Sequence, residues 1–156
     1  MAIPTALASL SPREAIADAM YRCIIGLDLN DWALFDSAWV QKSEASYDMP
    51  GLLAVTGLDA MKAKLFTHIG ALVTQHSISN IRVDVKDGAD TASLTAYGIA
   101  QHYRPGEGMD PTTKGLLTGA MYSIDVVKES GDDVWRVRKW SNRLLWLDGD
   151  RSIVSG

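Results

Sequence analysis

The chain of 156 residues is 47% hydrophobic and 22% charged, which is typical of a globular protein, and its length predicts one domain over residues 1–156. A net charge of −4 without a basic run argues against a nucleic-acid partner, and no apolar stretch approaches the roughly 20 residues that span a membrane. Cys23 is the single cysteine, which excludes an internal disulfide, and the N-terminus lacks the charged start of a secretory signal, so we expect a cytoplasmic protein.

A long helix is the first element expected. The sequence Ser11–Glu14 offers a cap, a first-turn proline and a capping box, which predicts a helix from Pro12 to about Leu29. Apolar residues recur at helical spacing within it and place Cys23 in the core rather than in a reactive site. Asp28 lies in line with this apolar stripe, where a carboxylate is either solvated at the helix end or functional.

Three further elements precede the second half of the chain. A short helix is expected to pack its aromatic residues into the core, and these are Trp32, Phe35 and Trp39. Alternation over Lys42–Met49 predicts a strand with Tyr47 on the apolar face, where its hydroxyl needs a partner or a wet cavity. A helix is expected over Leu58–Ile69, with His68 at the surface or capping its C-terminus.

Two long strands carry the histidines of interest. Val73–Lys86 changes parity midway, which predicts a bulge near Asn80, and its first half carries His76. After an Asp-Gly turn, Ala89–Arg104 places small residues and His102 on one face, as a cavity wall requires. The other face of this strand is apolar and predicts cover by another subunit; its large residues are Tyr97, Ile99 and Tyr103.

The remaining chain completes an antiparallel sheet. A loop is expected over Pro105–Lys114, strands over Gly115–Lys128 and Val134–Trp140, and a tail over Ser141–Gly156 that folds over the pocket mouth or onto a neighbouring subunit. The predicted class is therefore α+β, with helices packed on one face of a curved antiparallel sheet. Such a sheet closed by helices forms a cone with an interior pocket.

The inward polar residues predicted for this pocket suit proton transfer next to a carbonyl, and they are Asp28, Tyr47, His76, His102, Ser123 and Asp125. Histidine is matched to proton transfer near neutral pH, and a tyrosine can polarise a carbonyl. Loss of a β-hydroxyl would complete a dehydration. The alternatives are that each histidine is structural, or that the two histidines and Asp28 form a facial metal triad.

Several motifs in order resemble scytalone dehydratase, a SnoaL-like member of the cone folds typified by nuclear transport factor 2. These are Asp28-Leu-Asn-Asp-Trp32, Tyr47, Thr74-Gln75-His76, His102 with Arg104, Gly119 with Ser123 and Asp125, and Val134-Trp135-Arg136. The resemblance implies that His76 is the general base and acid, oriented by Ser123, and that His102 assists, held by Asp28. It further implies that Tyr47 polarises a substrate carbonyl through a water.

The resemblance also implies substrate contacts, a cofactor-free reaction and an oligomer. We expect the substrate to contact Asp125, Trp140, Met61, Leu65 and Asn142. Neither a metal nor an organic cofactor is implied, and the family's trimer, or a dimer, would cover the apolar outer face. The expected partner is thus a small-molecule substrate, with neither nucleic acid nor membrane.

Departures from the family pattern bear on the substrate. Leu27 stands where the family has a second water-holding tyrosine, and Asp125 stands where it has an asparagine. A polyketide-derived or other cyclic secondary metabolite is therefore favoured over scytalone, and cyclisation or isomerisation is open on the same residues. A non-catalytic binding module of this fold remains an alternative, as does an epoxide hydrolase using Arg82 or Arg104 between carboxylates.

Overall fold

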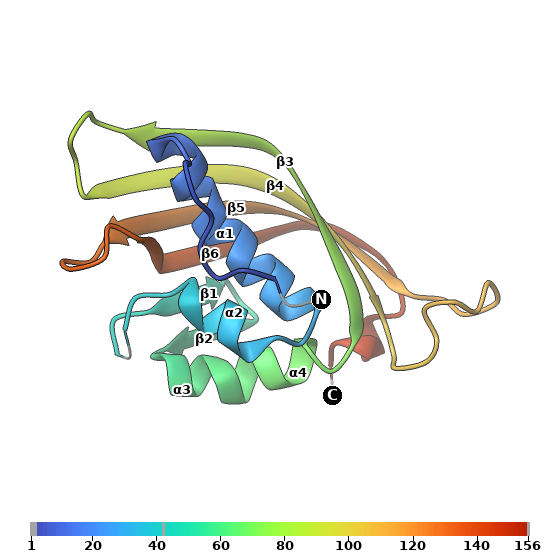
Figure 1. Cartoon of the computed structure of the whole chain (residues 1–156). Helices are drawn as coiled ribbons and strands as arrows, with labels where there is room; N and C mark the ends of the chain where they lie inside the picture. Colours follow the sequence, from blue (N-terminus) through green and yellow to red (C-terminus); the bar gives the residue numbers. More distant parts are fainter. Residues whose placement is uncertain (1–2, 42, 156) are drawn as a thin grey trace.

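The fold is built on one curved six-stranded sheet whose strand order is β2-β1-β6-β5-β4-β3 (Figure 1). The computed structural model describes residues 3–41 and 43–155. Met1, Ala2, Lys42 at the start of a predicted strand, and Gly156 at the end of the predicted tail lie outside the described residues. The strands are β1 (Ser46–Met49), β2 (Leu53–Thr56), β3 (Val73–Val85), β4 (Thr91–Tyr103), β5 (Leu116–Lys128) and β6 (Trp135–Gly149). All named strand pairs are antiparallel except β1 with β6, and the predicted α+β class is confirmed.

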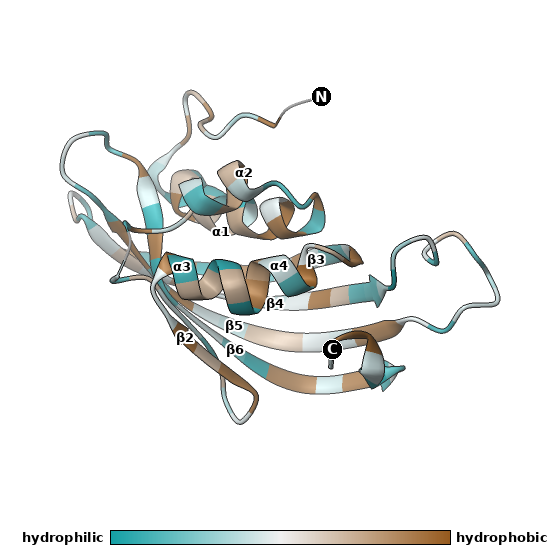
Figure 2. Ribbon diagram, turned by 90° about the horizontal axis from the view of Figure 1, so that it is seen from below, coloured by the Kyte–Doolittle hydropathy of each residue, from teal (hydrophilic) through white to brown (hydrophobic). Residues whose placement is uncertain are grey.

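The helices lie within the concave side of the sheet (Figures 1 and 2). Their bounds are α1 (Pro12–Asp28), α2 (Trp32–Ser37), α3 (Leu58–Met61), the π-helical turn η1 (Lys62–Phe66), α4 (Thr67–Ile69) and the C-terminal turn η2 (Arg151–Ile153). The predicted capping box at Ser11 and Glu14 is present, so the start of α1 is confirmed. In the described part of the chain, no helix is both long enough and apolar enough to cross a membrane.

The position of α1 is fixed by one close contact and one buried cation. Gly26 packs against the backbone of Phe35 in α2, where an added Cβ would lie 2.6 Å from the Phe35 nitrogen. Arg22 is only 4% exposed, and its guanidinium donates to the Ser37 and Trp135 carbonyls and pairs with Asp18 at 2.8 Å. These contacts tie α1 to the end of α2 and the start of β6. They thereby set the position of the C-terminal end of α1, where Asp28 lies.

The strand predictions are confirmed in part. The bulge appears as a register shift between Ser79 and Arg82, with Asn80 at φ 53. The last strand was predicted too short, because β6 continues past Trp140 to Gly149. Two register shifts along the β5–β6 pair interrupt the alternation of side chains, and this concealed the strand in the sequence. The short strand β2 was not predicted.

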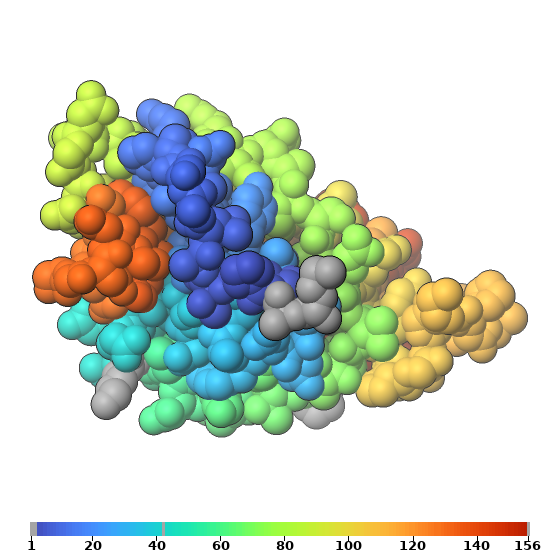
Figure 3. Space-filling view, viewed as in Figure 1, coloured from blue at the N-terminus to red at the C-terminus, as the bar shows by residue number. Residues whose placement is uncertain are grey.

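Two connecting segments project from the body of the molecule. The loop between β4 and β5, predicted from its Gly and Pro content, extends away from the sheet in Figure 3, and its Met109 is 95% exposed. The turn between β5 and β6 projects at the opposite side of the same view. Neither segment covers the concave side of the sheet, so the interior of the cone is closed by the helices and the C-terminal residues.

Replacing Gly26 by Ala is expected to lower the free energy of unfolding by about 1–3 kcal/mol, because the new methyl group overlaps the Phe35 backbone. Alanine is otherwise the better helix former by about 1 kcal/mol, so helix propensity alone predicts the opposite sign. Urea unfolding followed by circular dichroism measures the difference. A variant as stable as the parent protein would show that α1 and α2 do not pack this closely.

Candidate active site

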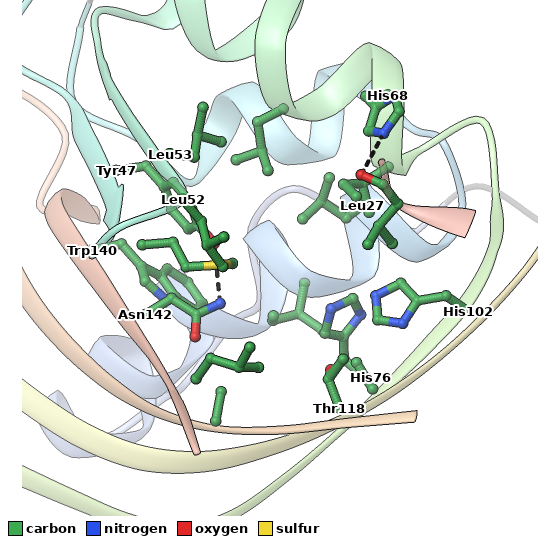
Figure 4. Close-up of a pocket in the computed structure, with 18 of the residues that line it drawn as sticks. Leu27, Tyr47, Leu52, Leu53, His68, His76, His102, Thr118, Trp140 and Asn142 are labelled. Atoms are coloured by element: carbon green, nitrogen blue, oxygen red, sulfur yellow. Dashed lines mark hydrogen bonds between the residues drawn. The ribbon is translucent and has the colours of Figure 1, made fainter. Parts of the chain in front are cut away.

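A cavity of about 910 Å³ fills the interior of the cone between the sheet and the helices. Such a volume suits a small organic ligand. Most of its lining is apolar, from α1, the α3–η1–α4 helix and strands β4, β5 and β6. Figure 4 shows its polar side chains in separate groups: His76 and His102 lie beside each other, whereas Tyr47, Trp140 and Asn142 lie on the other side.

The two histidines converge, as strand parity predicts. His76 projects from β3 and His102 from the adjacent β4, and their ring centroids are 5.9 Å apart in an edge-to-face arrangement. His76 is 10% exposed at its side chain, and His102 is buried. Both residues line the cavity, so both imidazoles are within reach of a bound molecule.

Asp28, at the end of α1, accepts three hydrogen bonds from β3. The Thr74 hydroxyl donates at 2.8 Å, the His76 backbone N–H at 2.9 Å, and the His76 Nδ1 at 2.6 Å. Burial by itself raises the pKa of the Asp28 carboxyl, but the hydrogen bonds and charge of His76, with the Thr74 hydroxyl, outweigh it and bring the pKa below its ordinary value. Asp28 is therefore ionised near neutral pH and holds the proton of His76 on Nδ1, which leaves Nε2 as the basic nitrogen.

His102 is held by the backbone instead of by a carboxylate. Its Nδ1 donates to the Leu116 carbonyl at 3.2 Å, which leaves its Nε2 as an acceptor. Burial lowers the pKa of His102, and the neighbouring His76 lowers it further, against the raising effects of the Leu116 hydrogen bond and of Asp28. His102 is thus a neutral imidazole near pH 7. The expected pairing of Asp28 with His102 was wrong, since the carboxylate contacts His76.

The expected placement of Ser123 and Asp125 in the pocket was also wrong. Ser123 is exposed on the outer face of β5, and Asp125 lies on that same face, paired with Ser93 and Lys139. The inward face of β5 is the apolar one, and its members are Ala120, Tyr122, Ile124 and Val126. Because both faces of β5 carry apolar residues, alternation alone did not determine which one is buried. The room left by Gly98 of β4 is filled by the Tyr122 ring.

Tyr47 lines the cavity from the buried face of its strand, as predicted, but it lies in a polar group away from the histidines. Its hydroxyl accepts a hydrogen bond from Asn142 Nδ2 at 3.0 Å, and burial raises the pKa of Tyr47, so it remains a protonated donor. Tyr47 pairs with Trp140 across the parallel β1–β6 ladder. In the described part of the molecule, Trp140 Nε1 and Asn142 Oδ1 are buried without a hydrogen-bond partner. A ligand that fills the cavity can satisfy these groups.

Not all of the other residues predicted to contact the substrate line the cavity. Leu65 lines the cavity together with Trp140 and Asn142, whereas Met61 is fully buried in the core and was wrongly assigned to the pocket wall. His68 was expected at the surface or as a helix cap; it lines the cavity and donates from Nε2 to the Val154 carbonyl at 3.1 Å. Cys23 is buried as predicted, and burial raises the pKa of its thiol.

Two groups that form hydrogen bonds with Asp28 or His102 were not identified from the sequence. Thr74 was noted only as part of a motif, although its position two residues before His76 on the same strand face indicates that both meet one partner. The carbonyl of Leu116 has no sequence signal, because any residue supplies one. Within residues 3–41 and 43–155, no three or more His, Cys, Asp and Glu side chains are grouped to hold a metal ion.

Comparison with known proteins agrees with this architecture. A SnoaL-like domain profile matches residues 8–141. The terrestric acid biosynthesis cluster protein E of Penicillium crustosum is 35% identical over 153 residues, which cover 97% of this chain and 96% of that protein.

Two solved structures show the same fold. A candidate scytalone dehydratase from Novosphingobium aromaticivorans superposes with a TM-score of 0.72 at 23% identity, over 88% of this chain and 86% of that one. A hexachlorocyclohexane dehydrochlorinase from Novosphingobium barchaimii superposes with a TM-score of 0.68 at 17% identity, over 89% of this chain and 90% of that one. At these identities the likeness concerns the fold.

The protein is expected to lose stability on acidification in two steps. The pKa of His102 is lower in the folded protein than in the unfolded chain. Its contribution to the free energy of unfolding is therefore full above about pH 6.5 and declines as the pH falls below that value. The pKa of Asp28 is also lower in the folded protein. Its contribution to the free energy of unfolding is therefore lost only at more acidic pH, from about 4 down through the pKa of the folded protein. Replacing His102 by Gln should flatten the first step by up to about 1.4 kcal/mol per pH unit. Urea unfolding between about pH 8 and pH 5 measures it, and an unchanged slope would contradict the account.

Proposed function

The chain belongs to the SnoaL-like domain family, and on that premise we propose that it is a cofactor-independent lyase that removes water from a small cyclic metabolite. The observation that carries the proposal is the Asp28–His76 pair, which presents a basic imidazole nitrogen to a largely apolar cavity. A relative that is 35% identical carries the name of a biosynthesis cluster protein, which supports a substrate from secondary metabolism, polyketide-derived compounds included.

The chemistry follows from the protonation states of the two histidines. In the proposed reaction, His76 Nε2 takes the proton from the carbon next to a carbonyl, and Asp28 stabilises the imidazolium that forms. The electron pair of the C–H bond is first delocalised into the carbonyl as an enolate. The carbonyl then re-forms, the new carbon–carbon double bond forms, and the neighbouring C–O bond breaks. The departing hydroxide receives the same proton from His76 and leaves as water. Neutral His102 orients the leaving hydroxyl group towards His76 by accepting a hydrogen bond from it on Nε2.

Tyr47 is the proposed stabiliser of this enolate, through a bridging water. Its hydroxyl remains protonated because burial raises the pKa of Tyr47. A second donor is the N–H of Trp140 on the adjoining strand, which has no hydrogen-bond partner among the described residues. Through pairing across the sheet, His76 lies level with Thr118 of β5, whereas Asn142 pairs with Tyr122, four residues further along. At about 3.3 Å per residue this is roughly 13 Å between backbone positions, which leaves room for a water between Tyr47 and the enolate oxygen.

The proposed reaction can be tested before the substrate is identified. Metabolite extracts from the source organism with the gene deleted are incubated with the purified protein, and mass spectrometry follows each compound. Dehydration depletes one compound and produces another that is lighter by one water. A product of unchanged mass would instead indicate isomerisation or cyclisation in the same pocket, and the absence of any conversion would favour a binding module.

Replacing His76 by Ala is expected to lower kcat by about 10²–10⁴-fold, because the base that removes the carbon proton is lost. Asp28→Asn should cause a loss of similar order, since the amide does not hold the Nδ1 proton as a carboxylate does. Ser123→Ala is the matched control on the outer face and should keep full turnover. Turnover that survives in His76→Ala would remove His76 from the mechanism.

Replacing Tyr47 by Phe is expected to lower kcat by about 10²–10³-fold while the fold is retained, because one donor to the developing oxyanion is removed. Tyr97→Phe removes a hydroxyl from a tyrosine that is 43% exposed on the outer face of β4, and it serves as the control. Steady-state kinetics separates the outcomes. A rise in KM alone, with kcat unchanged, would show that Tyr47 binds the substrate equally before and during the reaction.

A further inference from the structure

One rim of the cavity, called the mouth below, is lined by exposed residues from two segments that lie far apart in the sequence. One is the η1–α4 part of the third helix, and the other is the C-terminal turn η2 with the residues after it. The hydrogen bond from His68 Nε2 to the Val154 carbonyl joins them (Figure 4). Figure 2 shows this C-terminal turn at the ends of β5 and β6.

The charged side chains at this mouth have one sign. Lys64 of η1 and Arg151 of η2 line the cavity, and among the described lining residues there is no Asp or Glu. The chain as a whole has 19 acidic and 15 basic residues, so the lining does not reflect the overall composition. In the described part of the chain neither cation forms an ion pair. The nearby Asp150 is paired with Arg104 at 3.2 Å, which offsets its charge.

Lys64 and Arg151 are exposed, where ion pairs are weak, but both also border a largely apolar cavity. Low-dielectric walls lined by charge of one sign concentrate the field within a cleft. Arg151 offers a planar group that can bind a carboxylate through two hydrogen bonds. Lys64 adds a compact positive charge from the segment that the His68–Val154 hydrogen bond joins to the C-terminal turn. An anion at the mouth, attached to an apolar body inside, would use both the charge and the buried apolar surface.

We propose that the substrate of this protein carries a carboxylate that binds to Lys64 and Arg151 at the mouth while its cyclic body fills the cavity. This inference rests on the proposed function, because it defines the substrate class of the same site. It assigns Lys64 and Arg151 to substrate selection, apart from the proton transfer at His76. Neutral molecules of the same shape are then bound more weakly.

The test compares two probes of equal shape and different charge, 2-naphthoate and 2-naphthamide. Isothermal titration calorimetry near pH 8 measures binding to the whole protein, so the result does not depend on turnover. The expected result is that the naphthoate binds at least about tenfold more tightly than the amide. In the double variant Lys64→Gln/Arg151→Gln, naphthoate should bind as weakly as the amide does, and amide binding should be unchanged.

A second double variant controls for net charge. Arg82→Gln/Lys86→Gln removes two exposed cations from β3 and the turn after it, outside the cavity lining, and should keep the naphthoate preference. Equal binding of the two probes to the parent protein would overturn the proposal. A preference that persists in Lys64→Gln/Arg151→Gln would overturn it as well, since the anion would then bind elsewhere. His76→Ala should retain the preference, so failure of the proposed reaction and failure of this inference are distinguishable.

Discussion

The carboxylate of Asp28 joins the end of α1 to β3, and both the architecture and the chemistry of the interior depend on this contact. It accepts hydrogen bonds from the backbone and ring of His76 and from the Thr74 hydroxyl. Each bond favours the charged form, which is why a half-buried acid keeps a lowered pKa despite its burial. The buried Arg22 and the close approach at Gly26 hold α1 in the position that this contact requires.

The polar groups of the cavity differ in their protonation states. Asp28 is ionised beside His76, His102 is neutral beside the Leu116 carbonyl, and Tyr47 is a protonated donor. Each state has a local cause, which is a hydrogen bond, burial, or both. A base, a neutral acceptor and a donor therefore face one apolar volume, and this combination suits removal of a proton next to a carbonyl.

The sequence predicted well where one face of an element is clearly apolar. The capping box located the start of α1, and small residues leading to His102 identified the inward face of β4. It failed where both faces are apolar or the period is interrupted: Ser123 and Asp125 were assigned inward on β5, and the far half of β6 was taken for a tail. The partner of Asp28 was also missed, because it depends on how far α1 extends along β3, a tertiary distance that no local pattern encodes.

The proposed proton transfer depends on the tautomer of His76, which proton–nitrogen correlation spectroscopy of the imidazole rings near pH 8 measures. We expect a proton on Nδ1 and none on Nε2, with the Nδ1 signal displaced in Asp28→Asn. A proton on Nε2 would contradict this tautomer, because that nitrogen would then have no lone pair to receive a proton. A spectrum unaffected by Asp28→Asn would contradict it as well, because Asp28 would then not hold the Nδ1 proton.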